Sequence, residues 1–66
     1  QDAELRQMAL FLAEKAKESG QPQEIGPLNA YARRIVHLAV AEDPLLASES
    51  VGDASFKTIV ISTKSR

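Results

Sequence analysis

Two side chains four residues apart carry the most specific chemistry in this sequence. Arg33 and His37, the chain's one histidine, lie one above the other if their segment is an α-helix, because residues i and i+4 share a face. A guanidinium can grip a phosphate through two hydrogen bonds or stack on a base, and an imidazole can donate to a phosphate or a sugar hydroxyl. The pair therefore suggests contact with a nucleic acid, although from spacing alone a solvated helix face without a ligand is the default interpretation.

Three further cations are candidates to extend a positive patch around this pair: Arg34, Lys57 and Lys64. The net charge does not attract a polyanion, since eight basic residues face nine acidic ones and the total is −1. Any nucleic-acid binding must therefore come from local placement of charge. Because phosphate contacts position a strand without reading its sequence, we expect weak, salt-sensitive binding that is largely independent of sequence.

The sequence offers little for catalysis. It has one histidine, no cysteine, no glycine-rich phosphate loop and no cluster with metal-ligand spacing. His37 beside a carboxylate could in principle act as a general base, but Glu42 and Asp43 fall on the following turn and no nucleophile is evident. We therefore expect a protein that is not an enzyme, with no catalytic residue, no metal ion and no cofactor.

A single helix over residues 28–44 must position the Arg33–His37 pair. Asn29 is a good N-cap, and Pro44 ends the helix. At 100° per residue, the apolar positions gather on one side: Leu28, Tyr31, Ala32, Ile35, Leu38 and Ala39. This side is expected to be buried, which would leave the pair exposed on the opposite side.

The remaining segments form a second helix and three strands. Residues 2–19 have a helical apolar period that includes Met8 and that Phe11 could widen, and Gly20 ends this helix. Leu10 falls outside the arc, either as an isolated surface leucine or as a contact with a preceding domain. Residues 23–25 are a brief strand near two prolines, 45–51 a weaker strand, and 56–62 a β-branched strand after a Gly-Asp turn.

These elements predict an α+β fold in the order α-β-α-β-β. Two amphipathic helices and a small sheet each need one covered face, and a two-layer sandwich with both helices on one side of a three-stranded sheet satisfies them. The opposite face of the sheet would then be largely solvated. The length fits one small domain over residues 1–66.

No apolar run is long enough for a membrane helix, so we expect no membrane insertion. The absence of cysteine is compatible with a reducing compartment, and we expect the protein to be cytoplasmic.

The motif around the pair resembles that of a known family. Pro27-Leu28-Asn29-x-Tyr31-x-Arg33-Arg34-Ile35-Val36-His37, followed by Ser50-x-Gly52 and by the strand Phe56–Ile61, is similar to the R-three-H domain, named for an Arg and a His separated by three residues. The likeness is closest to the domain of the bacterial Jag (SpoIIIJ-associated) RNA-binding proteins and covers residues 19–62.

The resemblance implies an antiparallel three-stranded sheet with two helices packed on it, and non-catalytic binding of single-stranded RNA or DNA. It also implies a longer chain with an upstream KH domain. Lys57 stands where this group often has an arginine, and Glu49 is an acid close to the expected surface. An alternative function is a protein–protein interaction module within a larger RNA-associated or cell-envelope regulatory protein, because Glu42, Asp43 and Asp53 also fit a surface that meets protein.

Overall fold

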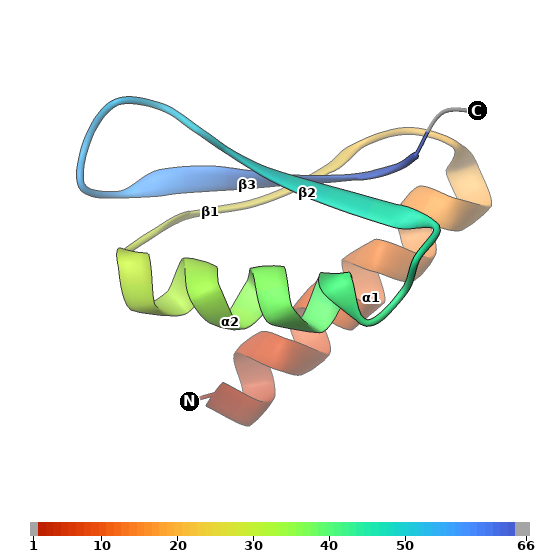
Figure 1. Cartoon of the computed structure of the whole chain (residues 1–66), viewed down its shortest axis with the longest axis horizontal. Helices are drawn as coiled ribbons and strands as arrows, with labels where there is room; N and C mark the ends of the chain where they lie inside the picture. Colours follow the sequence, from red (N-terminus) through yellow and green to blue (C-terminus); the bar gives the residue numbers. More distant parts are fainter. Residues whose placement is uncertain (1, 65–66) are drawn as a thin grey trace.

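The computed structural model describes residues 2–64, which form two helices and three strands. In chain order the elements are α1 (Asp2–Ser19), β1 (Gln23–Leu28), α2 (Ala30–Ala41), β2 (Leu46–Val51) and β3 (Lys57–Thr63). The predicted order α-β-α-β-β is confirmed, and so is the α+β class (Figure 1). Within the described part of the chain, neither helix is long and apolar enough to cross a membrane.

The three strands form one antiparallel sheet in the order β1-β3-β2. The β-branched strand β3 is central, and its Ile59 lies between Ile25 of β1 and Ser50 of β2. β1 continues to Leu28, beyond the predicted residues 23–25, with a shift in register between Ile25 and Leu28, so Pro27 belongs to this edge strand. An edge tolerates the missing amide hydrogen of proline.

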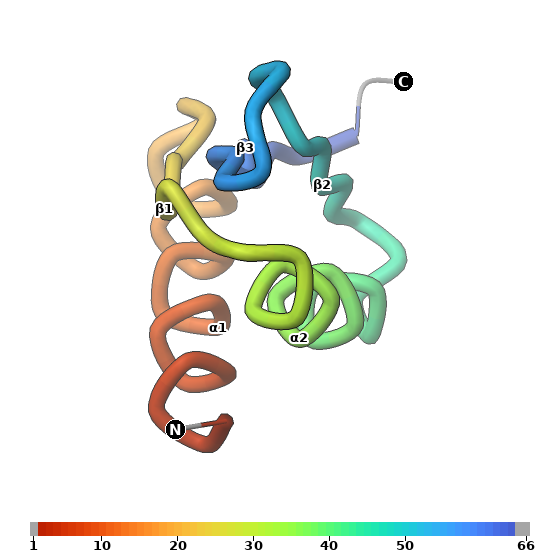
Figure 2. Tube along the Cα trace, turned by 90° about the vertical axis from the view of Figure 1, so that its left-hand side faces the viewer, coloured from red at the N-terminus to blue at the C-terminus, as the bar shows by residue number. Residues whose placement is uncertain are grey.

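Both helices pack on one face of the sheet, as predicted. Figure 1 shows them below the three strands, and Figure 2 shows α2 nearly end-on beside α1, whose N-terminal turns reach away from the sheet. On the opposite face, Glu24 and Glu49 lie on either side of Val60 in the strand register and are both exposed. The core between the layers consists of Ala9, Ala13, Ala16, Ile25, Val36, Ala39, Val40, Leu46, Ile59 and Ile61.

The predicted helix ends at Gly20 and Asn29 are confirmed by their hydrogen bonds, whereas α2 is shorter than the predicted 28–44, because Leu28 belongs to β1 and the helix ends at Ala41 before Pro44. Gly20, at φ +74°, donates its amide to the carbonyl of Ala16 at 2.9 Å and closes α1. Asn29 caps α2, because its side-chain oxygen accepts a hydrogen bond from the amide of Ala32 at 2.9 Å. The start of α2, and with it the placement of Arg33, is therefore fixed by local chemistry.

The predicted buried side of α2 is right in part, because Ala39 is buried and Leu28, just before the helix, packs against the core. Tyr31 and Leu38 are 63% and 58% exposed, whereas Val36 and Val40 are almost completely buried. The helix is rotated by roughly one residue position, about 100°, from the predicted orientation. The reason is that α2 carries apolar side chains around much of its circumference, and the sheet selects the β-branched pair that fills the space above Ile59 and Ile61.

On α1 the alanines are buried as predicted, but Met8 and Phe11 are 51% and 63% exposed, so their expected place in the core is wrong. Alanines let the backbone of α1 approach its neighbours closely, which leaves the longer side chains at the margin of the contact. Leu10 lies outside the buried arc as predicted and is 38% exposed.

Candidate nucleic-acid interface

Arg33 lies in the first turns of α2 and is half-buried. Its Nη1 donates to the carbonyl oxygen of Leu28 at 2.7 Å and to that of Ser55 at 2.9 Å. These carbonyls belong to the end of β1 and to the loop of residues 52–56 between β2 and β3. One guanidinium nitrogen therefore ties both segments to the start of α2, which lies at the same end of the molecule as this loop (Figure 1).

His37, one turn further along α2, is also half-buried and contacts β2 with both ring nitrogens. Its Nδ1 lies 2.6 Å from Oγ of Ser48, and its Nε2 lies 3.0 Å from Oγ of Ser50. The serines are two residues apart, so both face the helices. In a neutral imidazole one nitrogen donates and the other accepts, and a hydroxyl can do either. The edge of the ring that carries both nitrogens is therefore directed at β2.

The expected position of this pair, on the solvent side of the helix opposite the core, is wrong. Burial of Val36 and Val40 turns His37 toward β2, and Arg33 toward the end of β1 and the loop of residues 52–56. We call this border between α2 and the sheet the seam. The pair is brought together on one face as the four-residue spacing requires. It is half-buried and bonded to the protein rather than free in solvent.

The serine partners were not identified from the sequence as site residues. A signal for them exists in β2, where Leu46, Ser48 and Ser50 share one face. Leu46 is buried, so two polar residues following it on the helix-facing side indicate a polar partner on the opposing helix. His37 is that partner.

Among the other predicted cations, the structure groups Arg34 and Lys57 with Arg33. Lys57 begins β3 opposite Leu28, the residue whose carbonyl Arg33 holds. Arg34 follows Arg33 on α2 and is exposed. Across residues 2–64 none of these three cations forms an ion pair. We call Arg33, Arg34 and Lys57 the basic end of the domain; one exposed acid, Asp53, lies in the adjoining loop.

Lys64 is not part of the basic end. It follows the far end of β3, where its amide donates to the carbonyl of Leu45 at 2.9 Å. It lies seven positions after Lys57 along extended chain, which corresponds to about 23 Å. The structure therefore does not bring this predicted site residue near the other four.

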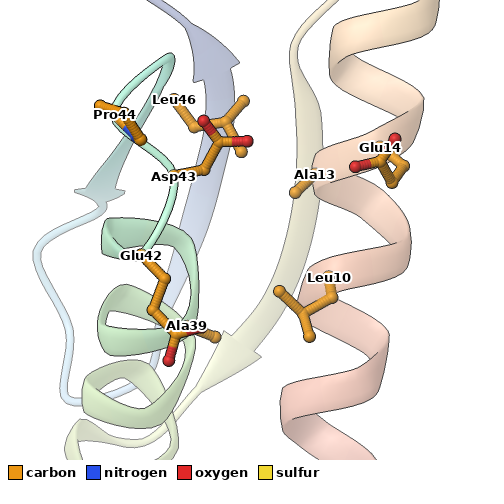
Figure 3. A pocket seen from close by; sticks show the side chains of 8 residues that line it. All are labelled: Leu10, Ala13, Glu14, Ala39, Glu42, Asp43, Pro44 and Leu46. Atoms are coloured by element: carbon orange, nitrogen blue, oxygen red, sulfur yellow. The ribbon is translucent and has the colours of Figure 1, made fainter.

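A depression of about 390 Å³ lies at the other end of α2, between that helix, α1 and the turn into β2 (Figure 3). Its lining includes three acids, Glu14, Glu42 and Asp43. Glu42 is paired with Arg6 at 2.8 Å, and Asp43 with Lys17 at 2.8 Å. This depression is unsuited to a phosphate because its acids outnumber the cations beside it.

The ion pair between Lys17 and Asp43 shifts the pKa of both groups. The hydrogen bond from Lys17, helped by the amide of Leu45, lowers the pKa of Asp43 below its ordinary value. The bonds to Asp43 and Glu14 raise the pKa of Lys17. No cluster of three His, Cys, Asp or Glu that could hold a metal ion occurs among residues 2–64.

Comparison with known proteins identifies the family. The family model of the R-three-H domain matches residues 3–63. The RNA-binding protein KhpB of Clostridium symbiosum is 33% identical over 60 residues, which cover 91% of this chain and 27% of that protein. The chain thus spans about a quarter of the length of this curated relative. Together with the predicted motif and the confirmed fold, these matches show that the chain belongs to the R-three-H domain family.

Proposed function

We propose that this domain binds single-stranded nucleic acid, RNA in the first instance, at its basic end and along the seam. The observation that carries the proposal is the grouping of Arg33, Arg34 and Lys57 without an ion pair within the described residues, while Arg6 and Lys17 are neutralised elsewhere. Family membership and the relative's name, an RNA-binding protein, support it.

Each residue of the proposed interface has a different role. The exposed Arg34 and the half-buried Lys57 bind phosphates. Arg33 uses Nη1 for the main chain, which leaves the donors on Nε and Nη2 for a phosphate. His37 connects α2 to β2 through its hydrogen bonds with Ser48 and Ser50. It presents the rest of its ring to the nucleic acid. Lys64, at the far end of β3, contributes little.

The open face of the sheet is not the binding surface in this proposal. Glu24 and Glu49 flank Val60 there, and two exposed carboxylates repel a phosphate backbone. The first turn of α2, in contrast, contains no acid, and the N-terminal end of a helix carries partial positive charge. In this proposal the single-stranded nucleic acid therefore runs past the start of α2 rather than across the sheet.

We further propose that binding is weak, non-catalytic and sequence-tolerant, and that it assists a neighbouring module in a longer cytoplasmic protein. Phosphate contacts carry no sequence information, and linking two weak modules raises their joint affinity. An upstream KH domain is the expected neighbour. The match to only 27% of the relative's length is consistent with such an arrangement.

The proposal is tested by fluorescence anisotropy with a short labelled single-stranded RNA at about 50 and about 200 mM salt. We expect affinity to fall as salt rises, and Arg34→Ala or Lys57→Ala to weaken binding and to reduce the salt slope by about one each. Lys64→Ala is the matched control, because it removes one positive charge outside the basic end. Binding that is absent, indifferent to salt or equally sensitive to Lys64→Ala would refute the proposal.

The alternative, a protein-interaction module, is favoured by one observation. Met8 and Phe11 lie three residues apart on α1, and therefore on the same side of that helix, and are 51% and 63% exposed. A contiguous exposed apolar patch is typical of a surface that meets protein. Absence of RNA binding in the titration would favour this second function.

A further inference from the structure

Phe56 is an exposed aromatic side chain at the basic end. It is the last residue of the loop between β2 and β3, immediately before Lys57, and is 58% exposed. Single exposed apolar residues are common on protein surfaces, so exposure alone assigns it no role. The evidence for a role comes from the contacts of its neighbours in the chain, Ser55 and Lys57.

The residues on both sides of Phe56 are connected to one guanidinium. The carbonyl of Ser55 accepts a hydrogen bond from Nη1 of Arg33 at 2.9 Å. Lys57 pairs across the sheet with Leu28, whose carbonyl accepts from the same nitrogen at 2.7 Å. The backbone around Phe56 is therefore held before any ligand arrives, and ordering it on binding costs little further entropy.

The other two aromatic residues have different neighbours: Tyr31 lies in the first turn of α2 but bonds to α1, and Phe11 lies on α1. The hydroxyl of Tyr31 donates to Asp2 at the start of α1 at 2.7 Å. Nζ of Lys15 lies 5.8 Å from the centre of the Phe11 ring. Phe56 is thus the aromatic residue that adjoins both a phosphate-binding lysine and the loop held by Arg33.

We propose that Phe56 stacks on a base of the strand whose phosphates are bound by Arg34 and Lys57. This inference rests on the proposed function and adds the base-contacting residue that phosphate binding alone lacks. Every nucleobase has an aromatic face, so stacking of this kind strengthens binding without reading sequence. Loss of the ring is expected to weaken binding of a base-containing strand about tenfold.

The chain contains no tryptophan, so a single one reports on its own surroundings. Phe56→Trp is titrated with unlabelled single-stranded RNA while indole fluorescence is recorded, with excitation at wavelengths that tyrosine does not absorb. The matched control is Phe11→Trp, because Phe11 is similarly exposed, at 63%, and also lies beside a lysine. We expect RNA to quench the indole at position 56 and to leave that at position 11 unchanged.

Side-chain variants separate stacking from apolar contact. Phe56→Ala should weaken binding about tenfold, Phe56→Tyr should restore it, and Phe56→Leu should not. An abasic strand of the same length should bind wild type and Phe56→Ala equally, because it offers phosphates without bases. Circular dichroism confirms that each variant is folded.

The outcomes distinguish this inference from the function on which it rests. If labelled RNA binds by anisotropy but Phe56→Trp fluorescence does not change, or if Phe56→Leu binds like wild type, the stacking inference is overturned and the proposed function stands. If no variant and no wild-type protein binds RNA, both fail.

Discussion

At the scale of single residues, Arg33 has both a structural role and a proposed role in binding. Its Nη1 donates to two main-chain carbonyls from segments far apart in sequence, and our proposal assigns its remaining donors to a phosphate. His37 similarly holds Ser48 and Ser50. A loss of RNA binding after substitution of either residue therefore does not by itself identify a ligand contact.

Arg33→Lys keeps the positive charge and removes the planar fork. The lysine side chain is one bond shorter than the path to Nη1 in arginine, so its nitrogen does not reach the position between the two carbonyls, and we expect the free energy of unfolding to fall by about 1 to 2 kcal/mol. Urea denaturation measures this change, and Arg34→Lys, on the exposed side of α2, is the control that should leave stability unaltered. A stability of Arg33→Lys equal to wild type would show that the two carbonyl bonds contribute nothing.

At the scale of elements, the end of β1 depends on Gly26. Its φ is +135°, and a Cβ built there would lie 3.1 Å from the carbonyl oxygen of Lys57 and 3.1 Å from Cα of Thr58. Gly26→Ala therefore combines backbone strain with a tight contact against the backbone of the central strand, which must shift by a few tenths of an ångström. We expect a loss of about 1 to 3 kcal/mol in unfolding free energy.

Gly20→Ala is the control for that measurement. Gly20 also has a positive φ, +74°, but nothing lies within 4 Å of a Cβ built there, so only the left-handed backbone cost of about 1 kcal/mol applies. Equal losses for Gly20→Ala and Gly26→Ala would contradict the proposed effect of the tight contact at Gly26. Because Leu28 follows the bulge, Gly26→Ala should also disturb the carbonyl that Arg33 holds.

The contact between α1 and the turn after α2 is sensitive to pH. The hydrogen bond from Lys17 lowers the pKa of Asp43 in the folded state, so the ionised carboxylate stabilises the fold above its ordinary pKa of 3.8. This contribution is lost as the pH falls through the lowered value.

Asp43→Asn tests this dependence, because an amide oxygen can still accept from the amide of Leu45 while the charge is removed. Urea midpoints should place wild type above the variant at neutral pH, and the two should converge in strong acid. A gap that persists at low pH would show that the carboxylate charge is not the source of the stabilisation.

The elements also show what the sequence could and could not predict. The ends at Gly20 and Asn29 follow from local chemistry, so they were predictable, as was the β-branched strand β3. The orientation of α2 was not, because apolar side chains such as Tyr31 and Leu38 compete with Val36 and Val40 for the core. Only packing against the sheet decides between them.

At the scale of the whole molecule, the geometry of the site also depends on packing that the sequence pattern does not determine. The four-residue spacing predicted that Arg33 and His37 share a face, but their burial depends on the rotation of α2. The sequence alone does not distinguish Lys57 from Lys64 as candidates for the site. The register of β3 against β1 places the first beside Arg33 and the second at the far end.

The distribution of charge over the whole domain supports one binding surface. The sheet's open face carries Glu24 and Glu49, and the far end of α2 carries paired acids. The basic end, whose three cations form no ion pair within the described chain, lies apart from both. A net charge of −1 is therefore compatible with nucleic-acid binding, because Arg33, Arg34 and Lys57 are grouped away from the paired acids and from the open face of the sheet.

The most direct test of this account is an NMR titration of the isotopically labelled domain with short single-stranded RNA. We predict salt-sensitive shift changes in the N-terminal half of α2, at Ser48 and Ser50, and through the loop and start of β3 over residues 52–57. The open face around Val60 and the helix α1 should show little change. Shift changes confined to that face or to α1, or none at saturating RNA, would contradict the account.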